Sequence, residues 1–256
     1  MKNILNFLCV FMSIFIFSQA KSVKKLPAKN VSKTIIKKAP AVAKSNPDLV
    51  IIHQDLPVLI PKKENGNFGY VNQNGKFIIK PEYHIAVFFY EDCNLLNSPN
   101  QKVRKFGTDD YATVEKDMIS YRVDKTGKRV YQFKDSDLGK CKFGDYKQQL
   151  YQAYVLNGFY GVIEKATFVN ASDYRDYKIY PQYQYLYIME GDDTTNPMIV
   201  ASHNDSFGVI DVNNKVIIPF EYSNIKRNFS WKLGRMFEVT KDGKNYYYID
   251  VRNKTY

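Results

Sequence analysis

Residues 207–222 of this 256-residue chain read FGVIDVNNKVIIPFEY, and residues 68–83 read FGYVNQNGKFIIKPEY. The two stretches align without a gap and are identical at 8 of 16 positions. In each copy an aromatic-Gly pair opens an extended run, residues that tolerate positive φ follow, and a β-branched run returns. The repeat predicts a β-hairpin whose two-residue turn is Asn74-Gly75 or Asn213-Asn214, and whose returning strand ends at Pro81 or Pro219.

The aromatic-Gly pairs have a packing interpretation. An aromatic ring needs an uncrowded neighbour, and glycine lets a packed side chain or the next strand come close because it has no Cβ. We therefore expect these pairs to be structural positions of the repeat: Phe68-Gly69, Tyr160-Gly161 and Phe207-Gly208.

Five segments repeat the pattern of a short strand, an Asn/Asp turn and a second strand. The second strands start at residues 68, 120, 160, 207 and 246, which are 52, 40, 47 and 39 residues apart. This spacing is typical of β repeats. Residues 48–256 are thus predicted to form an all-β domain of tandem antiparallel three-stranded meanders. We expect an open trough or solenoid, with a propeller-like closure as the alternative.

The two ends of this domain are predicted to meet. The fifth unit reaches Tyr256 with its third strand nearly missing, whereas the domain begins with a spare hydrophobic run at residues 49–52. Unpaired hydrophobic edges invite aggregation, so we expect the spare run to pair with the C-terminal unit.

The net charge of +11 is concentrated ahead of this domain. Lys2 carries one unit, and residues 21–47 contain eight lysines and no acid, which leaves +2 for residues 48–256. Residues 21–47 also lack aromatic residues, so we expect a disordered Lys-rich linker. Two interpretations remain open, namely attraction to an anionic surface and a soluble spacer. Without interleaved aromatic residues, the linker does not indicate specific binding of nucleic acid.

Residues 1–20 have the features of a secretory signal peptide. Lys2 precedes an apolar run from Ile4 to Phe17, and Ser18-Gln19-Ala20 supplies small residues for cleavage. The run is shorter than the roughly 20 residues that span a bilayer, so no transmembrane segment is expected after cleavage. The chain is therefore predicted to be exported, to the periplasm, the cell surface or the medium. Cleavage leaves Cys93 and Cys141, which could form one disulfide or remain two buried thiols.

The repeated order of short strand, Asn/Asp turn, aromatic-Gly pair and β-branched run resembles the WG-repeat family, which is named for a Trp-Gly pair. That pair would fall on Phe68-Gly69, Tyr160-Gly161 and Phe207-Gly208, but none of these positions holds tryptophan, and Trp231 lies between two units. Phe and Tyr can fill a similar packing role. The resemblance covers most of residues 56–256. It implies an exported interaction scaffold of bacterial type, and the family offers no catalytic residues to transfer.

The residues give little indication of catalysis. The three histidines are scattered, and no acidic cluster has the spacing of a calcium loop, so neither a metal nor another cofactor is expected. Acids recur at one position of the repeat, where Asp and Asn cap turns, although a carbohydrate-active enzyme could use them as its carboxylates. These recurring acids are Asp124, Glu164, Asp211 and Asp250.

The tyrosines indicate a candidate binding surface. The chain has 21 of them, and alternation from Tyr183 through Tyr185 to Tyr187 would place three rings on one face of a strand. An exposed face would be a platform for a peptide or for sugar rings, and a buried face would be core. Together with Trp231, these residues form the surface through which we expect a non-enzymatic scaffold to bind an envelope protein or glycan.

Overall fold

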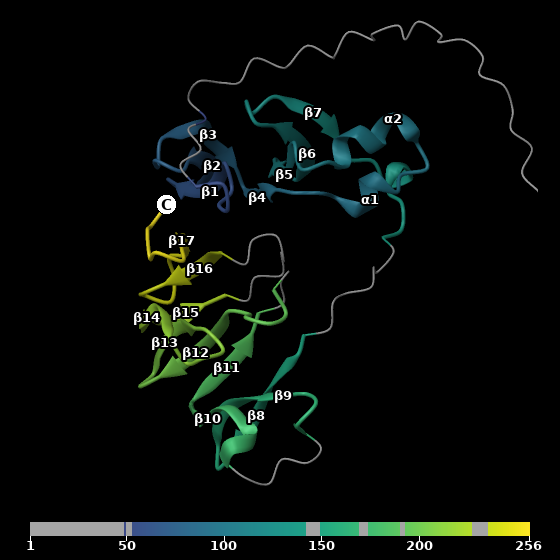
Figure 1. The fold of residues 1–256 in the computed structure, drawn as a ribbon. Helices are drawn as coiled ribbons and strands as arrows, with labels where there is room; N and C mark the ends of the chain where they lie inside the picture. The colour runs from purple at the N-terminus through teal and green to yellow at the C-terminus, as the bar shows by residue number, and fades with distance from the viewer. Residues whose placement is uncertain (1–48, 50–52, 142–148, 169–173, 190–192, 227–234) are drawn as a thin grey trace, which may run out of the picture. The chain divides into compact units, whose positions relative to one another are not determined.

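The computed structural model describes residue 49 and residues 53–141, 149–168, 174–189, 193–226 and 235–256 (Figure 1). All of them belong to a compact unit that spans residues 44–256. The predicted signal peptide (1–20), the Lys-rich linker (21–47) and Trp231 lie outside the described residues. Among the described residues, no helix is both long and apolar enough to cross a bilayer.

The unit consists of five small antiparallel sheets, which confirms the all-β prediction. The first sheet contains β1 (Leu59–Glu64), β2 (Asn67–Asn72) and β3 (Phe77–Tyr83). The second contains β4 (Ile85–Phe89), β5 (Tyr111–Lys116), β6 (Ile119–Asp124) and β7 (Arg129–Gln132). The third contains β8 (Tyr151–Leu156), β9 (Phe159–Glu164) and β10 (Tyr177–Tyr183), with the 3-10 turn η4 (Tyr174–Asp176) ahead of β10.

The fourth sheet contains β11 (Tyr185–Ile188), β12 (Ile199–His203), β13 (Ser206–Ile210) and β14 (Val216–Tyr222). The fifth contains β15 (Asn224–Ile225), β16 (Met236–Thr240) and β17 (Tyr247–Asp250). In place of its third strand, the fifth sheet has a single bridge between Ile249 and Thr255. The shortened last unit is therefore confirmed.

Three strands differ from the prediction: β4 and β15 were not predicted, and β11 was predicted only as a continuation of the strand that ends at Tyr183. β4, β11 and β15 follow the last strand of one sheet after a single residue and join the next sheet as its outer strand. They lie beside β5, β12 and β16 respectively. Each of these three sheets therefore receives a strand from the preceding unit, so the second and fourth sheets have four strands instead of the three that the repeat predicts.

The first turn of four of the hairpins is of the two-residue type. Both turn residues have positive φ, as a type I′ turn requires, so the prediction of Asn and Asp turns is confirmed in these four units. The pairs are Asn65-Gly66, Asp117-Met118, Asn157-Gly158 and Asn204-Asp205.

The second turn differs from the prediction. The N–H of Asn72 donates to the carbonyl of Lys76 (2.9 Å), which leaves three residues in the loop rather than two. Only one of the three, Gly75, has positive φ. A type I turn followed by one left-handed residue is the usual three-residue hairpin loop. Gly127, Asn214 and Asn253 hold the same place in three other units.

Proline does not end the returning strands, contrary to the prediction. β3, β10 and β14 run through Pro81, Pro181 and Pro219. In the first sheet the register moves from Tyr70↔Ile79 to Phe68↔Tyr83, so Gly69 faces a bulge that contains the proline. A bulged segment leaves N–H groups out of the ladder, which is why proline is tolerated there.

A helical insertion separates β4 from β5 and accounts for the longest spacing between units. It contains α1 (Cys93–Leu96), α2 (Gln101–Arg104) and the 3-10 turn η1 (Lys105–Gly107). Cys93 forms a disulfide with Cys141, which follows the 3-10 turn η2 (Asp135–Asp137). Of the two possibilities that the sequence left open for these cysteines, the structure shows the disulfide. It links the insertion to the segment after β7.

Arg122 of β6 holds the insertion in place through hydrogen bonds to its backbone. Its side chain is fully buried and donates to the carbonyls of Phe106 (2.9 Å), Tyr90 (3.0 Å) and Thr108 (2.8 Å), and to the Thr113 hydroxyl (3.0 Å). Burial lowers the pKa of this guanidinium, although nearby Asp92 opposes the shift. Four acceptors keep the buried cation hydrogen-bonded, as such a group requires.

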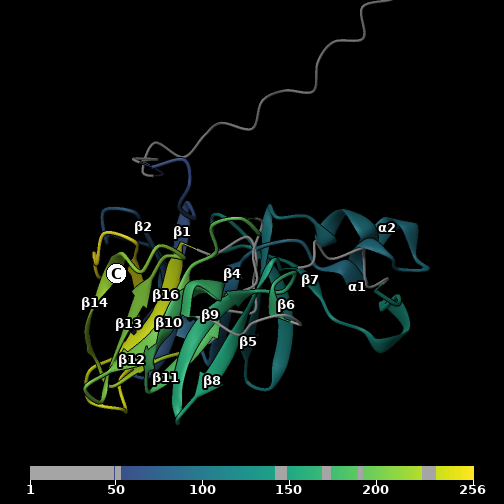
Figure 2. The same cartoon turned by 60° about the horizontal axis from the view of Figure 1, so that its bottom comes forward.

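Four buried clusters join the sheets in pairs. One cluster packs the third sheet against the fourth, a second packs the fourth against the fifth, and another packs the first against the second. The remaining cluster joins the first and fifth sheets through residues such as Ile60, Val71 and Tyr256. Figure 1 shows the C-terminal residues beside β1, and Figure 2 shows β16 alongside β1. Among the described residues, no such cluster joins the second sheet to the third.

This contact between first and last sheets is the one that the propeller-like alternative requires, but none of the sheets formed by the described strands closes into a barrel. The predicted pairing of the spare run with the C-terminal unit falls mainly on residues 50–52, which lie outside the described residues. Leu49, the described residue of the run, packs against the cluster of the first two sheets. The contact that the structure describes between the ends of the domain is made by residues such as Ile60, Val71 and Tyr256.

Candidate binding surface

The predicted tyrosine platform is divided between two sheets. Tyr183 is the last residue of β10 and Tyr185 the first of β11, so the three tyrosines do not lie along one strand. Tyr183 is 5% exposed, its hydroxyl donates to Asn214 Oδ1 (2.6 Å), and its ring stacks on Phe220 at 5.8 Å. Because ring and hydroxyl are both used inside the molecule, Tyr183 is a core residue and not part of a binding face.

Tyr185 and Tyr187 are half-buried on β11. The Tyr185 ring lies between Tyr160 (centroids 6.4 Å apart) and Phe207 (5.7 Å), so it bridges two aromatic-Gly positions. Tyr187 packs against the cluster between the fourth and fifth sheets. These two rings connect neighbouring units and expose only part of their surface. Trp231, the fourth residue of the predicted surface, lies outside the described residues.

The aromatic-Gly pairs have the packing role that the sequence predicts. Phe68, Tyr160 and Phe207 are half-buried, and Gly69, Gly161 and Gly208 are buried against the returning strand. A Cβ added to Gly69 or Gly161 would lie 2.7 Å from the nitrogen of Pro81 or Pro181. A Cβ on Gly208 would lie 2.7 Å from the carbonyl oxygen of Ile218. Real side chains do not fit at such distances, so each glycine permits the close approach of the bulged strand.

The recurring acids form turns. Asp124 Oδ1 accepts from the N–H groups of Thr126 (2.9 Å) and Lys128 (3.0 Å), and Asp211 makes the same two bonds in its unit. Asn72 occupies this position in the first unit and bonds the same way. A carboxylate is thus not required for the role. Glu164 is the exception, since it is exposed at the end of β9.

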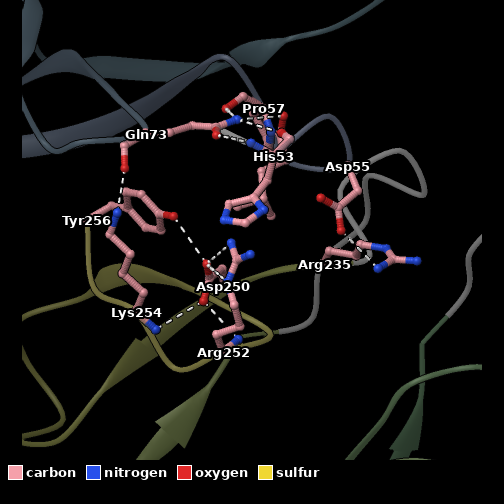
Figure 3. Close-up of polar contacts among 10 residues, drawn as sticks. His53, Asp55, Pro57, Gln73, Arg235, Asp250, Arg252, Lys254 and Tyr256 are labelled. Carbon is pink, nitrogen blue, oxygen red and sulfur yellow. Dashed lines mark hydrogen bonds and ion pairs between the residues drawn. The ribbon is translucent and has the colours of Figure 1, made fainter. Parts of the chain in front are cut away.

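Asp250 also forms a turn and has the most elaborate surroundings of the four acids (Figure 3). It accepts from the N–H groups of Arg252 (2.8 Å) and Lys254 (3.0 Å), from the Arg252 guanidinium (2.6 Å) and from the Tyr256 hydroxyl (3.2 Å). Burial by itself would raise the pKa of Asp250, but the bonds from Arg252 and Lys254 together lower it. A general acid needs the opposite shift, so this carboxylate is suited to structure.

The junction around Asp250 joins the two ends of the domain. Figure 3 shows Lys254 reaching Gln73, whose carbonyl accepts from Nζ at 2.6 Å. The Gln73 amide in turn binds the backbone of His53 (2.9 Å) and Leu56 (3.2 Å). Arg235 and Asp55 form an exposed ion pair of 2.9 Å at the same junction. These contacts join the two ends of the domain. In the described part of the chain, no group of three or more His, Cys, Asp or Glu side chains could hold a metal ion.

The exposed apolar side chains are concentrated in and around the third sheet. Among the described residues, eleven large hydrophobic side chains are exposed, and six of them lie between residues 150 and 180. We call these six the third-sheet surface: Leu150, Val155, Phe159, Phe168, Tyr174 and Tyr180. The sequence missed this surface because no periodicity distinguishes β8 and β9 from the strands of other units. The signal is that no described element covers these side chains, which only the fold reveals.

Rings extend the third-sheet surface. Tyr154 lies against Phe168 (5.9 Å) and Tyr177 (5.5 Å), and Tyr177 lies against Tyr180 (5.5 Å). Apolar rings that carry hydroxyl groups are enriched at protein interfaces because they offer both contact area and hydrogen bonds. The arrangement is suited to binding.

Hairpin units with Asn/Asp turns, joined face to face by buried clusters, define a β-repeat protein. Two segments, residues 68–93 and 207–244, match the family model described as WG containing repeat. They include Phe68-Gly69 and Phe207-Gly208, so the resemblance seen in the sequence is confirmed at these two units. A search of curated proteins found no match.

Among solved structures, the chain is similar to one described as "Crystal structure of the eukaryotic initiation factor", with 11% sequence identity and a TM-score of 0.29. The match covers 77% of this chain and 51% of that one. The chain thus spans about half the length of that protein.

Proposed function

We propose that this chain is an exported, non-enzymatic β-repeat scaffold that binds a protein or a glycan at the cell envelope. The observation that supports this proposal most strongly is the third-sheet surface: six of the eleven large hydrophobic side chains that are exposed among the described residues lie in the third sheet or directly beside its strands. Exposed apolar groups that cluster in this way mark interaction sites on soluble proteins. Tyr174 and Tyr180, which are 70% and 50% exposed, offer hydroxyl groups for a polar or glycan ligand.

The turn acids support a role without catalysis. Asp124, Asp211 and Asp250 each hold two backbone N–H groups of their own turn, and Asn72 does the same without a charge. Carboxylates engaged in this way are not positioned as an acid and a nucleophile on either side of a bond.

Two features support export. Residues 1–20 have the order of charged, apolar and small residues that a secretory signal needs. Cys93 and Cys141 form a disulfide, a bond that persists in oxidising compartments outside the cytosol.

Site-specific photo-crosslinking on living cells tests the scaffold proposal. A photoreactive residue replaces Tyr180, and the control replaces Val216, which is equally exposed (50%) but lies in the fourth sheet. We expect a discrete adduct of defined mass from position 180 and none from position 216. Adducts that are equally abundant at both positions, or absent from both, would contradict binding through the third-sheet surface.

The Lys-rich linker is proposed to attract the chain to anionic surfaces. Eight of the eleven net positive charges lie in residues 21–47, so their removal should abolish salt-sensitive binding to anionic vesicles. The measurement compares residues 21–256 with residues 48–256 in co-sedimentation at low and high salt. Equal sedimentation of the two chains with the vesicles would show that the linker is only a spacer.

A further inference from the structure

Among the described strands, β8 is an edge strand of its sheet, whereas the first hairpin strands β5, β12 and β16 of three other sheets each have a further strand beside them. The sheet orders place β4, β11 and β15 beside β5, β12 and β16, whereas β8 pairs with β9 alone among the described residues (Figure 1). β1 is the other first strand of a hairpin without an outer neighbour in its sheet. Three sheets of the same chain therefore show what a strand at this vacant place looks like.

The three outer strands share one register. Each starts opposite an equivalent residue of its partner, in the pairs Ile85↔Glu115, Tyr185↔Ser202 and Asn224↔Thr240. Glu115 and Ser202 are themselves paired with the unit starts Ser120 and Phe207. Val155 is paired with the unit start Tyr160, so it holds this position in β8.

The same three strands share one hydrogen bond. The N–H of the residue just before the outer strand donates to the carbonyl of the equivalent partner residue: His84 to Glu115 (2.8 Å), Gln184 to Ser202 (3.0 Å) and Ser223 to Thr240 (2.9 Å). In β8, Lys165 N–H donates to the Leu150 carbonyl, which fixes which backbone groups face β9. By alternation, the N–H and C=O groups of Ala153 and Val155 point to the vacant side.

The outer strands also share one buried side chain. Their second residues, Ala86, Leu186 and Ile225, are 9%, 5% and 4% exposed, and they lie opposite Val114, Ala201 and Val239, which are fully buried. Tyr154 holds the corresponding position in β8 and is only half-buried. Val155 is 49% exposed, whereas its counterparts Ser202 and Thr240 are 5% and 0% exposed.

The chain itself explains the vacancy. The segment after β7 is the one that would supply this strand, but it is tied to the helical insertion instead. Asp137 accepts from the Tyr131 hydroxyl (2.9 Å), Gly139 N–H donates to the Asn94 carbonyl (2.9 Å), and Cys141 is bonded to Cys93.

β1 shows how this chain protects a strand edge that it does not use. Pro61 is paired with Tyr70 as Ala153 is with Val162, and Lys63 is paired with Phe68 as Val155 is with Tyr160. Proline and lysine at outward positions block pairing with a further strand. β8, with the sequence YQAYVL, contains neither a proline nor a charge.

We propose that β8 accepts an extended strand from a partner protein, which pairs antiparallel with it and starts opposite Val155. This rests on the proposed scaffold function and narrows its partner to a peptide segment. The register requires a small or aliphatic residue opposite Tyr154, as in β4, β11 and β15. Strand addition supplies affinity through the main chain and specificity through alternate side chains.

The test uses the mature chain and a fluorescent peptide with the sequence of residues 184–189, which contains β11. The control peptide carries Leu186→Asp. Ala153→Pro and Val155→Lys transfer the protection of β1 to β8 without removing a bond to β9. Val216→Lys is the matched control, because Val216 is similarly exposed (50%) but lies in the fourth sheet.

We expect the peptide to bind the wild-type chain and the Val216→Lys variant alike, and to bind the two edge variants roughly tenfold more weakly or not at all. The Leu186→Asp peptide should bind no better than to those edge variants. Hydrogen exchange should slow at the amides of Ala153 and Val155. Binding that is unaffected by Ala153→Pro, or protection that appears on β12 because the peptide replaces β11, would overturn the proposal.

Self-association of the chain that Ala153→Pro abolishes would assign the vacant place to a second copy and would also overturn it. Loss of peptide binding is distinguishable from failure of the scaffold function. If the peptide fails to bind while the adduct at position 180 persists, strand addition is wrong and the scaffold remains. If both are absent, both proposals are wrong.

Discussion

At the scale of single residues, the aromatic-Gly pairs work through the space beside the glycine. Gly69, Gly161 and Gly208 lie where the returning strand bulges, and each added Cβ would meet backbone atoms of that strand. The proline in the bulge has no backbone N–H to donate, so few hydrogen bonds are lost when the bulged residues leave the β-sheet ladder. The pair is therefore a steric device, and phenylalanine or tyrosine serves in it as the aromatic partner.

Gly208→Ala is expected to lower the free energy of unfolding by about 2 kcal/mol, because the new methyl group would overpack against the carbonyl of Ile218. Asn196→Ala is the control. Its exposed side chain lies in a loop, so the expected cost is below about 0.5 kcal/mol. Urea unfolding of both variants is the measurement. Equal midpoints would refute the steric role of the glycine.

Asp250 should make stability depend on pH. Burial opposes its ionisation, but the bonds from Arg252 and Lys254 prevail and hold the pKa of the folded state below the ordinary value. A lowered pKa in the folded state stabilises the protein above about pH 4, and this contribution is lost as the pH falls further.

Asp250→Asn should therefore flatten the decline of stability between neutral and acidic pH. Asparagine keeps the oxygen that caps the turn, as Asn72 does in the first unit. Urea midpoints measured from pH 7 to pH 3 compare the variant with the wild type. Parallel declines of the two proteins would mean that Asp250 contributes nothing to the acid sensitivity.

At the scale of elements, the hairpins could be predicted from the sequence, whereas the outer strands that pair with them could not. Asn65-Gly66 and Asn157-Gly158 encode their turns locally, because positive φ is a property of the residues themselves. The outer strands β4, β11 and β15 depend on where a neighbouring sheet lies, which no local pattern contains. Tyr183 and Tyr185 show the same limit, since their alternation continues across a change of sheet.

Arg122 illustrates why the insertion was missed. Its counterparts in other units are Tyr70, Val162, Val209 and Tyr248, so a charged residue at this position reads as an exposed one. The arginine is instead buried by acceptors that belong to a segment inserted between strands. The third-sheet surface likewise depends on tertiary structure. It is a binding candidate only because nothing in the described structure covers it.

The disulfide fastens the insertion, so its loss should be felt at this scale. Replacing both Cys93 and Cys141 by serine removes a cross-link between residues 48 positions apart, and we expect a loss of about 2–4 kcal/mol in the free energy of unfolding. Urea unfolding with and without a thiol reductant is the measurement. The wild type should respond to the reductant, whereas the double variant should not. A double variant as stable as the oxidised wild type would contradict the role of the disulfide.

At the scale of the whole unit, the first and last sheets share one core. Tyr256 is 4% exposed and packs with Leu56, Ile60 and Met236, which come from opposite ends of the domain. Phe88 and Tyr248 meet edge to face at 4.8 Å in the same region. The last residue of the chain therefore contributes to the burial of the first hairpin.

Tyr256→Ala should lower the free energy of unfolding by roughly 3 kcal/mol, as large-to-small changes of buried aromatic residues do. Amide exchange should quicken in β1 and β2 as well as in β17, since one cluster supports both sheets. Arg235→Ala is the control at the same junction. Its ion pair with Asp55 is exposed, so the expected cost is below about 1 kcal/mol. Faster exchange confined to β17 would show that the ends of the domain are not coupled.

This junction also sets an order of events for a chain that is made from its N-terminus. Lys254 Nζ and the Gln73 carbonyl are 181 positions apart, and contacts of such separation slow folding because a long loop must close before they form. Ile60 and Val71 leave the ribosome early but obtain part of their cover only from Met236 and Tyr256. The first hairpin of the domain is thus among the last parts of the domain to obtain full cover, and until then part of its apolar surface faces water.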